Sequence, residues 1–327
     1  MKIKALIAAA CLALAGAAQA GTVGFQRVTV PVDGDTPLAA AIWYPADAPA
    51  QDMPLALFHQ RVAPDAPVAG RKHPLVVISH GTGGSLADHY DTAHALAEAG
   101  FVVAALTHTG DTRGDRSRTL RITERSGQII PLIDYMTTAW SGREAVDAGR
   151  IGAFGFSSGG FTVLGAIGGK PDMSKVGPYC AAQPKVFTCA LQQGPGVGAT
   201  PATPAPVAHD RRIRAAVVAA PALGFTFEPN GLNAVSVPVQ IWRAEQDTIL
   251  PHPDYADAVH RLLPEAEYRV VAGAEHWDFM APCSEALSQV APVICPRTID
   301  RDAFHRTFNA EIVRFFEATL TRVGRTR

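Results

Sequence analysis

Residues 150–166 read RIGAFGFSSGGFTVLGA and contain the pattern Gly-x-Ser-x-Gly at 155–159. The apolar residues before the pattern predict a buried strand, and the small and apolar residues after it favour a helix. A sharp turn between such a strand and helix exposes the hydroxyl of its central serine above a sheet, and glycines permit the turn. The stretch therefore predicts an α/β fold with Ser157 as a candidate nucleophile.

Apolar runs and helical patterns alternate along the rest of the chain. Strands are predicted at 25–32, 38–44, 74–79, 101–106, 150–156, 213–219, 237–242 and 267–271, and helices at 87–99, 129–138 and 302–320. The alternation predicts a doubly wound, mostly parallel sheet. The first two strands flank a turn and predict an N-terminal hairpin, and the Pro/Ala-rich stretch 45–70 is expected to be an exposed loop.

The first twenty residues have the form of a secretory signal. Met1-Lys2-Ile3-Lys4 is basic, 5–15 is apolar, and Ala18-Gln19-Ala20 is a small-x-small cleavage site. We expect cleavage after Ala20, an α/β domain over 21–327 and a periplasmic or secreted location. A lipoprotein signal at Cys11 is the alternative, although the residues before it match poorly. No later stretch is long enough to span a membrane.

The net charge of the chain argues against a nucleic-acid-binding or membrane-surface protein. Without Lys2 and Lys4 of the signal, 27 of the 29 basic residues remain against 30 acidic ones, a net charge of −3. This balance offers no general attraction to nucleic acid or anionic membranes. The oligomeric state leaves no trace in the sequence.

Four cysteines remain after removal of the signal and fall into two local pairs. An even number in an oxidising compartment favours disulfides, and of three connectivities we favour Cys180–Cys189 and Cys283–Cys295. A zinc site is the alternative, but there is no Cys-x-x-Cys spacing and no paired histidine nearby. We expect no metal and no organic cofactor.

Two later loops carry the partners that a nucleophilic serine needs, a base and an acid that orients it. After this type of turn the acid and then the histidine follow the serine, each at the carboxyl end of a later strand. Asp247 follows the strand at 237–242 and is favoured over Glu245, and His276 follows the last strand. The plainer interpretation of Asp247 is a turn or helix-cap residue. The order predicts a triad of Ser157, His276 and Asp247.

A glycine-rich loop after the strand at 74–79 is the candidate oxyanion site. It reads His80-Gly81-Thr82-Gly83-Gly84. The backbone amides of Thr82 and Ser158 are expected to bind the developing negative charge. A tight turn that needs glycine for steric reasons alone is the other interpretation, and both can hold. We expect the histidine of this loop to support it by hydrogen bonding, and His108 to line the mouth of the site.

The segment 170–210 is irregular and lies between the helix after Ser157 and the strand at 213–219. It contains the first cysteine pair and a Gly/Pro/Ala tract at 194–208. A lid-like insertion over the site and a surface insertion without a role are both open.

Four stretches resemble two related groups of bacterial hydrolases. They read LVVISHGTGG at 75–84, ALAEAGFVVAA at 95–105, DAGRIG at 147–152 and HWDF at 276–279. They resemble the platelet-activating-factor acetylhydrolase-like family and equally the predicted dienelactone hydrolases, over about 25–320. The resemblance implies an α/β-hydrolase fold. It also implies triad roles for Ser157, Asp247 and His276 and oxyanion roles for Thr82 and Ser158.

Two features depart from these groups. True dienelactone hydrolases use a cysteine nucleophile where this chain has Ser157, so that activity is not expected. The acetylhydrolases place their acid after an earlier strand, and residues 217–222 carry no carboxylate here. The acid is therefore expected at Asp247, without a specific phospholipid substrate.

Together these features predict an exported serine hydrolase that cleaves carboxylic esters through an acyl-enzyme. A small-molecule, lipid or polymer ester is the expected partner. An amidase or peptidase using the same triad is the second enzyme hypothesis. A catalytically silent binding protein of the same fold is the alternative from another class, although no triad member is missing from the sequence.

Overall fold

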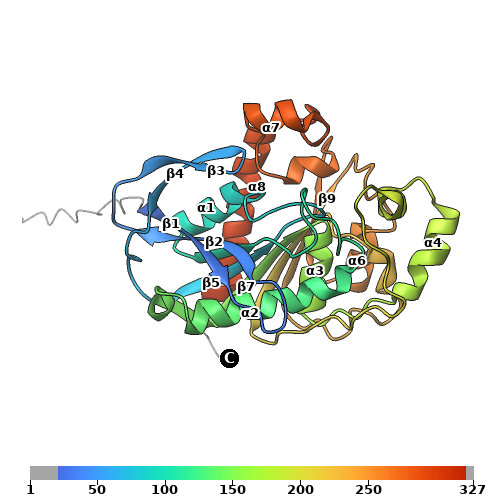
Figure 1. The fold of residues 1–327 in the computed structure, drawn as a ribbon, viewed down its shortest axis with the longest axis horizontal. Helices are drawn as coiled ribbons and strands as arrows, with labels where there is room; N and C mark the ends of the chain where they lie inside the picture. Colours follow the sequence, from blue (N-terminus) through green and yellow to red (C-terminus); the bar gives the residue numbers. More distant parts are fainter. Residues whose placement is uncertain (1–20, 322–327) are drawn as a thin grey trace, which may run out of the picture.

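The computed structural model describes residues 21–321, in which one large sheet is covered by helices (Figure 1). The strands are β1 (Thr22–Val30), β2 (Leu38–Ala46), β3 (Gln51–Leu55), β4 (Phe58–Pro64), β5 (His73–Ser79), β6 (Val102–Leu106), β7 (Val146–Phe156), β8 (Ile213–Ala219), β9 (Val239–Ala244) and β10 (Glu267–Val271). The α-helices are α1 (Tyr90–Glu98), α2 (Arg125–Thr138), α3 (Ser158–Ala166), α4 (Val176–Ala182), α5 (Phe187–Ala190), α6 (Ala256–Leu262), α7 (Glu285–Val290) and α8 (Arg301–Phe316). The predicted secretory signal at 1–20 lies outside the described residues.

The strand order places the carboxyl ends of the central strands together. The sheet runs β10-β9-β8-β7-β5-β6-β2-β1-β4-β3, and the six strands from β10 to β6 are parallel. The chain order reverses at β5, which lies between β6 and β7. Ligands of open α/β sheets bind outside the carboxyl ends at such a switch point. Thr82 follows β5 and Ser157 follows β7, so both lie at this point.

The two faces of the sheet bury separate apolar cores. One core contains side chains of α2, α3 and α6, and the other contains side chains of α1 and α8. The residues Leu75 to Ile78 of β5 are almost fully buried, as expected for a parallel strand covered on both faces. The predicted doubly wound α/β architecture is confirmed.

The N-terminal hairpin is also confirmed and lies between the six parallel strands and the pair β4 and β3. β1 pairs with β2 over their whole length, and β2 pairs antiparallel with β6. The hairpin thereby joins the parallel strands to the rest of the sheet.

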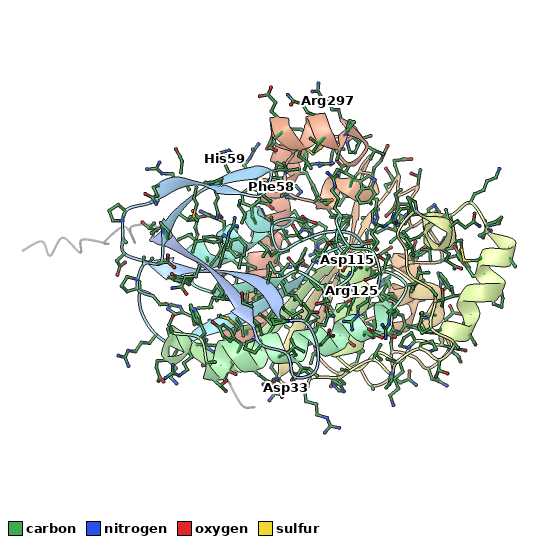
Figure 2. All side chains as sticks on the ribbon, in the orientation of Figure 1. Asp33, Phe58, His59, Asp115, Arg125 and Arg297 are labelled. Atoms are coloured by element: carbon green, nitrogen blue, oxygen red, sulfur yellow. A yellow bond between two sulfur atoms is a disulfide. The ribbon has the colours of Figure 1, made fainter. Side chains whose placement is uncertain are left out.

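The prediction of an exposed loop at 45–70 is wrong, because β3 and β4 form a second hairpin there. Phe58 and Val62 are buried, His59 is exposed, and Gln60 accepts a hydrogen bond of 2.8 Å from the Trp43 indole. Figure 2 labels Phe58 and His59 on this hairpin. The alternation of buried and exposed residues in β4 is a strand pattern that the proline and alanine content of the stretch concealed.

Two predicted helices begin elsewhere. α1 begins at Tyr90 instead of 87, and α2 begins at Arg125, four residues before the predicted start. The first turn of α2 contains the polar Arg125 and Gln128, which are buried because they hydrogen-bond inside the protein. Within residues 21–321, no helix has both the length and the apolar character required to cross a bilayer.

Candidate active site

Ser157 occupies a strained turn between β7 and α3. Its φ of 55° and ψ of −119° are rare for a residue with a side chain. The backbone is held there by a hydrogen bond of 2.9 Å from the Ser157 amide to the Ala219 carbonyl, and the Ser157 carbonyl accepts from Ala222 at 3.0 Å. Backbone strain of this kind persists where surrounding contacts over-determine it.

The glycines of the turn are required by close packing. A Cβ on Gly155 would lie 2.1 Å from the Gly159 carbonyl oxygen, and a Cβ on Gly159 would lie 1.9 Å from the Ser79 carbonyl oxygen. These neighbours are backbone atoms of the same turn and of β5. The Gly-x-Ser-x-Gly pattern therefore lets α3 pack directly against the end of β5.

The three residues predicted as a triad lie in one hydrogen-bonded chain. His276 Nε2 is 3.1 Å from Ser157 Oγ, and His276 Nδ1 is 2.8 Å from Asp247 Oδ2. They follow the carboxyl ends of β7, β9 and β10. The His276 ring also packs on Phe156, with ring centroids 4.8 Å apart. An imidazole held this way can accept a proton from the serine while the carboxylate fixes its tautomer.

Asp247 divides its two oxygens between the loop and the histidine. Oδ1 accepts the amides of Ile249 at 3.0 Å and Leu250 at 2.7 Å, while Oδ2 faces His276. The turn-residue interpretation and the triad geometry thus hold together. The competing Glu245 instead accepts the Gly273 amide at 2.9 Å on the exposed side of the loop.

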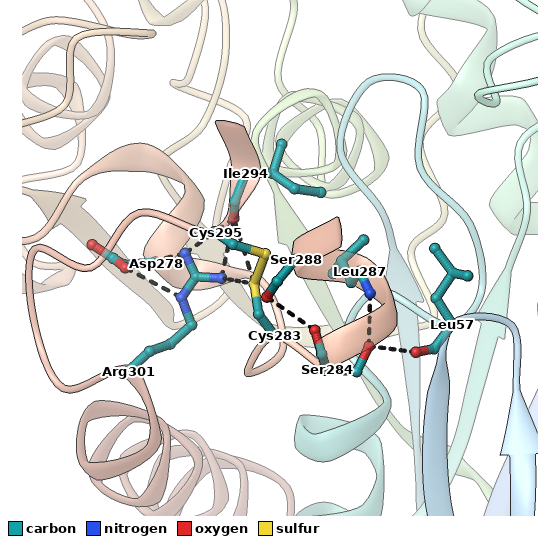
Figure 3. Close-up of a disulfide and its surroundings, with 9 residues drawn as sticks. All are labelled: Leu57, Asp278, Cys283, Ser284, Leu287, Ser288, Ile294, Cys295 and Arg301. Carbon is teal, nitrogen blue, oxygen red and sulfur yellow. Dashed lines mark hydrogen bonds and ion pairs between the residues drawn. A yellow bond between two sulfur atoms is a disulfide. The ribbon is translucent and has the colours of Figure 1, made fainter. Parts of the chain in front are cut away.

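The loop that carries His276 rests on a second buried carboxylate, Asp278. Asp278 accepts the Glu275 amide at 2.8 Å, the Thr298 hydroxyl at 2.8 Å and the Arg301 guanidinium at 3.2 Å. Arg301 also donates to the Ile294 carbonyl at 3.1 Å and lies 3.0 Å from the Cys283 sulfur (Figure 3). Asp278 and Arg301 therefore link the histidine loop to the neighbouring disulfide loop.

Both predicted disulfides are confirmed. Cys180 pairs with Cys189, and Cys283 pairs with Cys295. The first bond closes part of the segment 170–210. The second closes the loop 283–295, which Arg301 links to Asp278. Among residues 21–321, no group of three or more His, Cys, Asp and Glu side chains is placed to hold a metal ion.

Thr82 and Ser158 meet beside Ser157. Their hydroxyl oxygens are 2.5 Å apart, which brings the loop after β5 against the first residue of α3. Ser158 is in the first turn of that helix, where amide groups have no partner within the helix and carry partial positive charge. The arrangement offers a place for an oxyanion next to the Ser157 hydroxyl.

Two histidines near this loop serve its structure. His80 Nε2 accepts the His108 amide at 3.0 Å, as expected for a supporting residue. The expectation that His108 lines the mouth of the site is wrong, because its side chain is fully buried. His108 Nε2 lies 2.8 Å from Ser79 Oγ, and Nδ1 lies 2.7 Å from Gln128 Oε1. Burial, and then the charge of Arg125, hold the pKa values of both histidines well below their usual range. Both rings are therefore neutral at physiological pH.

An apolar cavity of about 810 Å³, its open mouth included, begins at Ser157. The segment 170–210 forms one side, with η3 (Met173–Lys175), α4, α5 and η4 (Leu191–Gln193). Apolar side chains from that segment and from the loops after β6, β8 and β9 line the cavity: Leu120, Ile122, Met173, Val176, Phe187, Leu191, Leu223 and Leu250. The mostly apolar lining, with a few hydroxyl groups near Ser157, suits an organic group of a small-molecule ligand.

Sequence reasoning missed the charged residues that support the site. Asp111, Arg125, Asp278 and Arg301 are all buried, which is rare for charged side chains unless they are paired. Asp278 stands two residues after His276, and this proximity is the one sequence feature that could have indicated its supporting role. For Asp111 and Arg125 no motif marks either residue.

Comparisons with known proteins identify the fold. No family model and no curated protein matches the chain. Among solved structures, a ferulic acid esterase from Streptomyces cinnamoneus aligns with a TM-score of 0.61 over 96% of this chain and 94% of that chain, at 19% sequence identity. The large, mostly parallel sheet flanked by helices agrees with that likeness. The chain has the α/β-hydrolase fold.

Proposed function

We propose that this protein is a serine esterase that hydrolyses carboxylic esters through an acyl-enzyme. The observation that carries the proposal is the hydrogen-bonded chain from Ser157 through His276 to Asp247, in which Ser157 lines an apolar cavity. The structural likeness to a ferulic acid esterase supports ester chemistry on this fold. The narrower resemblance to acetylhydrolase-like and dienelactone hydrolase-like proteins is part of the same proposal.

The proposed reaction has two halves. Ser157 Oγ attacks the ester carbonyl carbon and passes its proton to His276 Nε2, while Asp247 holds the Nδ1–H tautomer. The amides of Thr82 and Ser158 stabilise the negative oxygen of the tetrahedral intermediate. His276 then gives its proton to the departing alcohol. A water molecule, deprotonated by His276, attacks the acyl-enzyme and releases the acid and Ser157.

The cavity indicates the class of ester. Its lining is mostly aliphatic, with Phe187 as the aromatic member and threonine and serine hydroxyls near Ser157. We propose that it receives an apolar acyl group or the apolar part of a larger ester. The segment 170–210 then acts as a lid-like cover, because its side chains form one side of this cavity. The two disulfides support the proposed periplasmic or secreted location.

The proposal is tested by comparing the hydrolysis of p-nitrophenyl esters of increasing chain length with that of the amide p-nitroacetanilide. The wild type is expected to cleave the esters with saturation kinetics and the anilide much more slowly, and Ser157→Ala is expected to abolish both. Faster turnover of the anilide would make the protein an amidase. Absence of any turnover by folded wild type would favour a binding protein of this fold.

A further inference from the structure

A buried ion pair beside the proposed oxyanion loop has no part in the proposed proton transfers. Arg125, at the start of α2, pairs with Asp111, and their side chains are only 3% and 2% exposed. Figure 2 labels Arg125 within the molecule. Removing two charges from water can cost more than their attraction returns, so such a pair is weak evidence for stability. Its contacts indicate a different role.

The pair holds the backbone on both sides of Thr82. Arg125 Nη2 donates to the His80 carbonyl. Asp111 Oδ1 accepts the Gly83 amide at 3.0 Å. These two backbone groups flank Gly81 and Thr82, the part of the loop that must present an amide to the oxyanion. A loop this rich in glycine has many accessible conformations on its own, and the two contacts select one.

The same guanidinium also reaches the helix after the nucleophile. Arg125 Nε donates to the Thr162 hydroxyl at 3.1 Å, and that hydroxyl donates to the Ser158 carbonyl at 2.7 Å. Asp111 Oδ1 further accepts the Thr119 hydroxyl at 2.9 Å. One buried cation is therefore hydrogen-bonded, directly or through a single hydroxyl, to the segments that carry both candidate oxyanion amides.

We propose that Arg125, oriented by Asp111, is a positioning residue that fixes the distance between the Thr82 and Ser158 amides. The inference rests on the proposed function. Donors already in place when charge develops need no reorganisation, so their alignment lowers the barrier of the chemical step. Substrate binding in the apolar cavity does not depend on that alignment. Loss of the pair should therefore lower kcat far more than it changes KM.

The double variant Asp111→Leu/Arg125→Met removes both charges together and leaves no unpaired buried ion. Apolar replacements of buried ion pairs often fold as well as the original protein. With p-nitrophenyl butyrate we expect kcat to fall about 10- to 100-fold, less than the roughly 10²- to 10³-fold cost of removing an oxyanion donor outright, because the donors are misaligned and not removed. We expect KM to stay within about threefold. Inhibition by a trifluoromethyl ketone, whose serine adduct carries the oxyanion, should weaken in step with kcat/KM.

Arg125→Lys is the second, milder variant. It keeps a cation beside Asp111, but a single ammonium cannot reproduce the fork that reaches Asp111, the His80 carbonyl and Thr162. We expect a smaller fall in kcat, again without a matching change in KM. Arg212→Ala is the matched control, because Arg212 pairs with Asp134 and Asp210 next to the amino end of β8, opposite the site. Its kcat should equal that of the wild type.

The outcomes separate the two proposals. Folded variants that retain wild-type kcat and ketone affinity would overturn the positioning role, as would a loss confined to KM. A wild type that neither hydrolyses esters nor reacts with a fluorophosphonate at Ser157 would overturn the proposed function itself. Melting curves of each variant establish that it is folded when it is assayed.

Discussion

The site has a serine half, made of Ser157 and the loop 80–84, and a histidine half, made of His276 and Asp247 with their loops. A buried arginine–aspartate pair supports each half, but the two pairs hold different kinds of segment. Arg125 and Asp111 hold a glycine-rich loop at the centre of the sheet by hydrogen bonds alone. Arg301 and Asp278 hold a loop after β10, the edge strand, and Arg301 also contacts a disulfide-closed loop. Central strands have a neighbouring strand on each side, whereas the edge strand β10 has one, and a disulfide closes the loop 283–295 that Arg301 contacts.

In the histidine half, substitution of Asp247 is expected to have the largest effect on catalysis. Asp247→Asn keeps the size of the side chain but removes the charge that fixes the His276 tautomer, so kcat should fall by about 10⁴. Glu245→Gln is the matched control, because Glu245 contacts only the Gly273 amide among these loops. Ester hydrolysis by the two purified variants measures both effects. If Glu245→Gln were the more damaging change, the acid would be wrongly assigned.

Gly159 tests the serine half through packing. A Cβ there would lie 1.9 Å from the Ser79 carbonyl oxygen, so Gly159→Ala must displace α3 or β5. We expect a loss of about 3 kcal/mol in the free energy of unfolding, together with loss of activity. Gly177→Ala in α4 meets no atom within 4 Å and should be neutral or slightly stabilising. Urea unfolding of both variants compares them, and equal stabilities would refute the steric account of the turn.

The two disulfides distinguish the histidine half from the cavity cover. Their sequence separations are 9 and 12, so each removal should cost a similar amount, about 2–3 kcal/mol. Their effects on activity should differ. Cys283→Ala/Cys295→Ala should lower kcat for every ester, because the histidine loop is loosened. Cys180→Ala/Cys189→Ala should instead raise KM for long-chain esters, and identical kinetic changes in the two variants would contradict this division.

The buried His89 packs against the end of β7, which leads to Ser157, and its substitution is expected to have the smallest effect, on stability alone. The centroid of its ring lies 5.0 Å from that of Phe154 and 5.4 Å from that of Phe156. The Phe156 ring also packs against the His276 ring. Burial lowers the pKa of His89 to about 4 from a usual value of 6.5. The unfolded chain therefore binds more protons between these pH values. The stability that neutral His89 provides is complete above pH 6.5 and declines as the pH falls toward 4.

His89→Phe removes this titration and keeps an aromatic ring in place. Relative to the wild type, its free energy of unfolding should rise by about 1.4 kcal/mol for each pH unit below 6.5, or about 2 kcal/mol at pH 5. Denaturant unfolding at pH 7.5, 6 and 5 provides the comparison. A difference that does not change with pH would show that His89 is not held neutral.

The parts of the site that could be predicted are those set by local sequence. The glycines around Ser157 and the loops that begin at the ends of β9 and β10 follow from strand and turn chemistry. The fold is confirmed, and the geometry brings Ser157, His276 and Asp247 together, while their catalytic roles stay predictions. The same holds for the oxyanion roles of Thr82 and Ser158.

The supporting residues could not be predicted because their partners come together only in the folded chain. Arg125 contacts Asp111, His80 and Thr162, which come from three other segments of the chain, and no spacing in the sequence signals these contacts. The burial of His108 likewise depends on Gln128, from the next helix. The hairpin of β3 and β4 was missed for another reason, since the buried positions of β4 include the polar Gln60 and the proline and alanine content of 45–70 predicts a loop.

Covalent labelling of Ser157 tests the central claim most directly. The purified wild type is incubated with a fluorophosphonate at neutral pH, and the modified peptide is identified by mass spectrometry. The account predicts one phosphonyl group on Ser157, no labelling of Ser157→Ala, and slow labelling of Asp247→Asn. Folded wild type that stays unlabelled, or that is labelled elsewhere with Ser157 unmodified, would contradict the account.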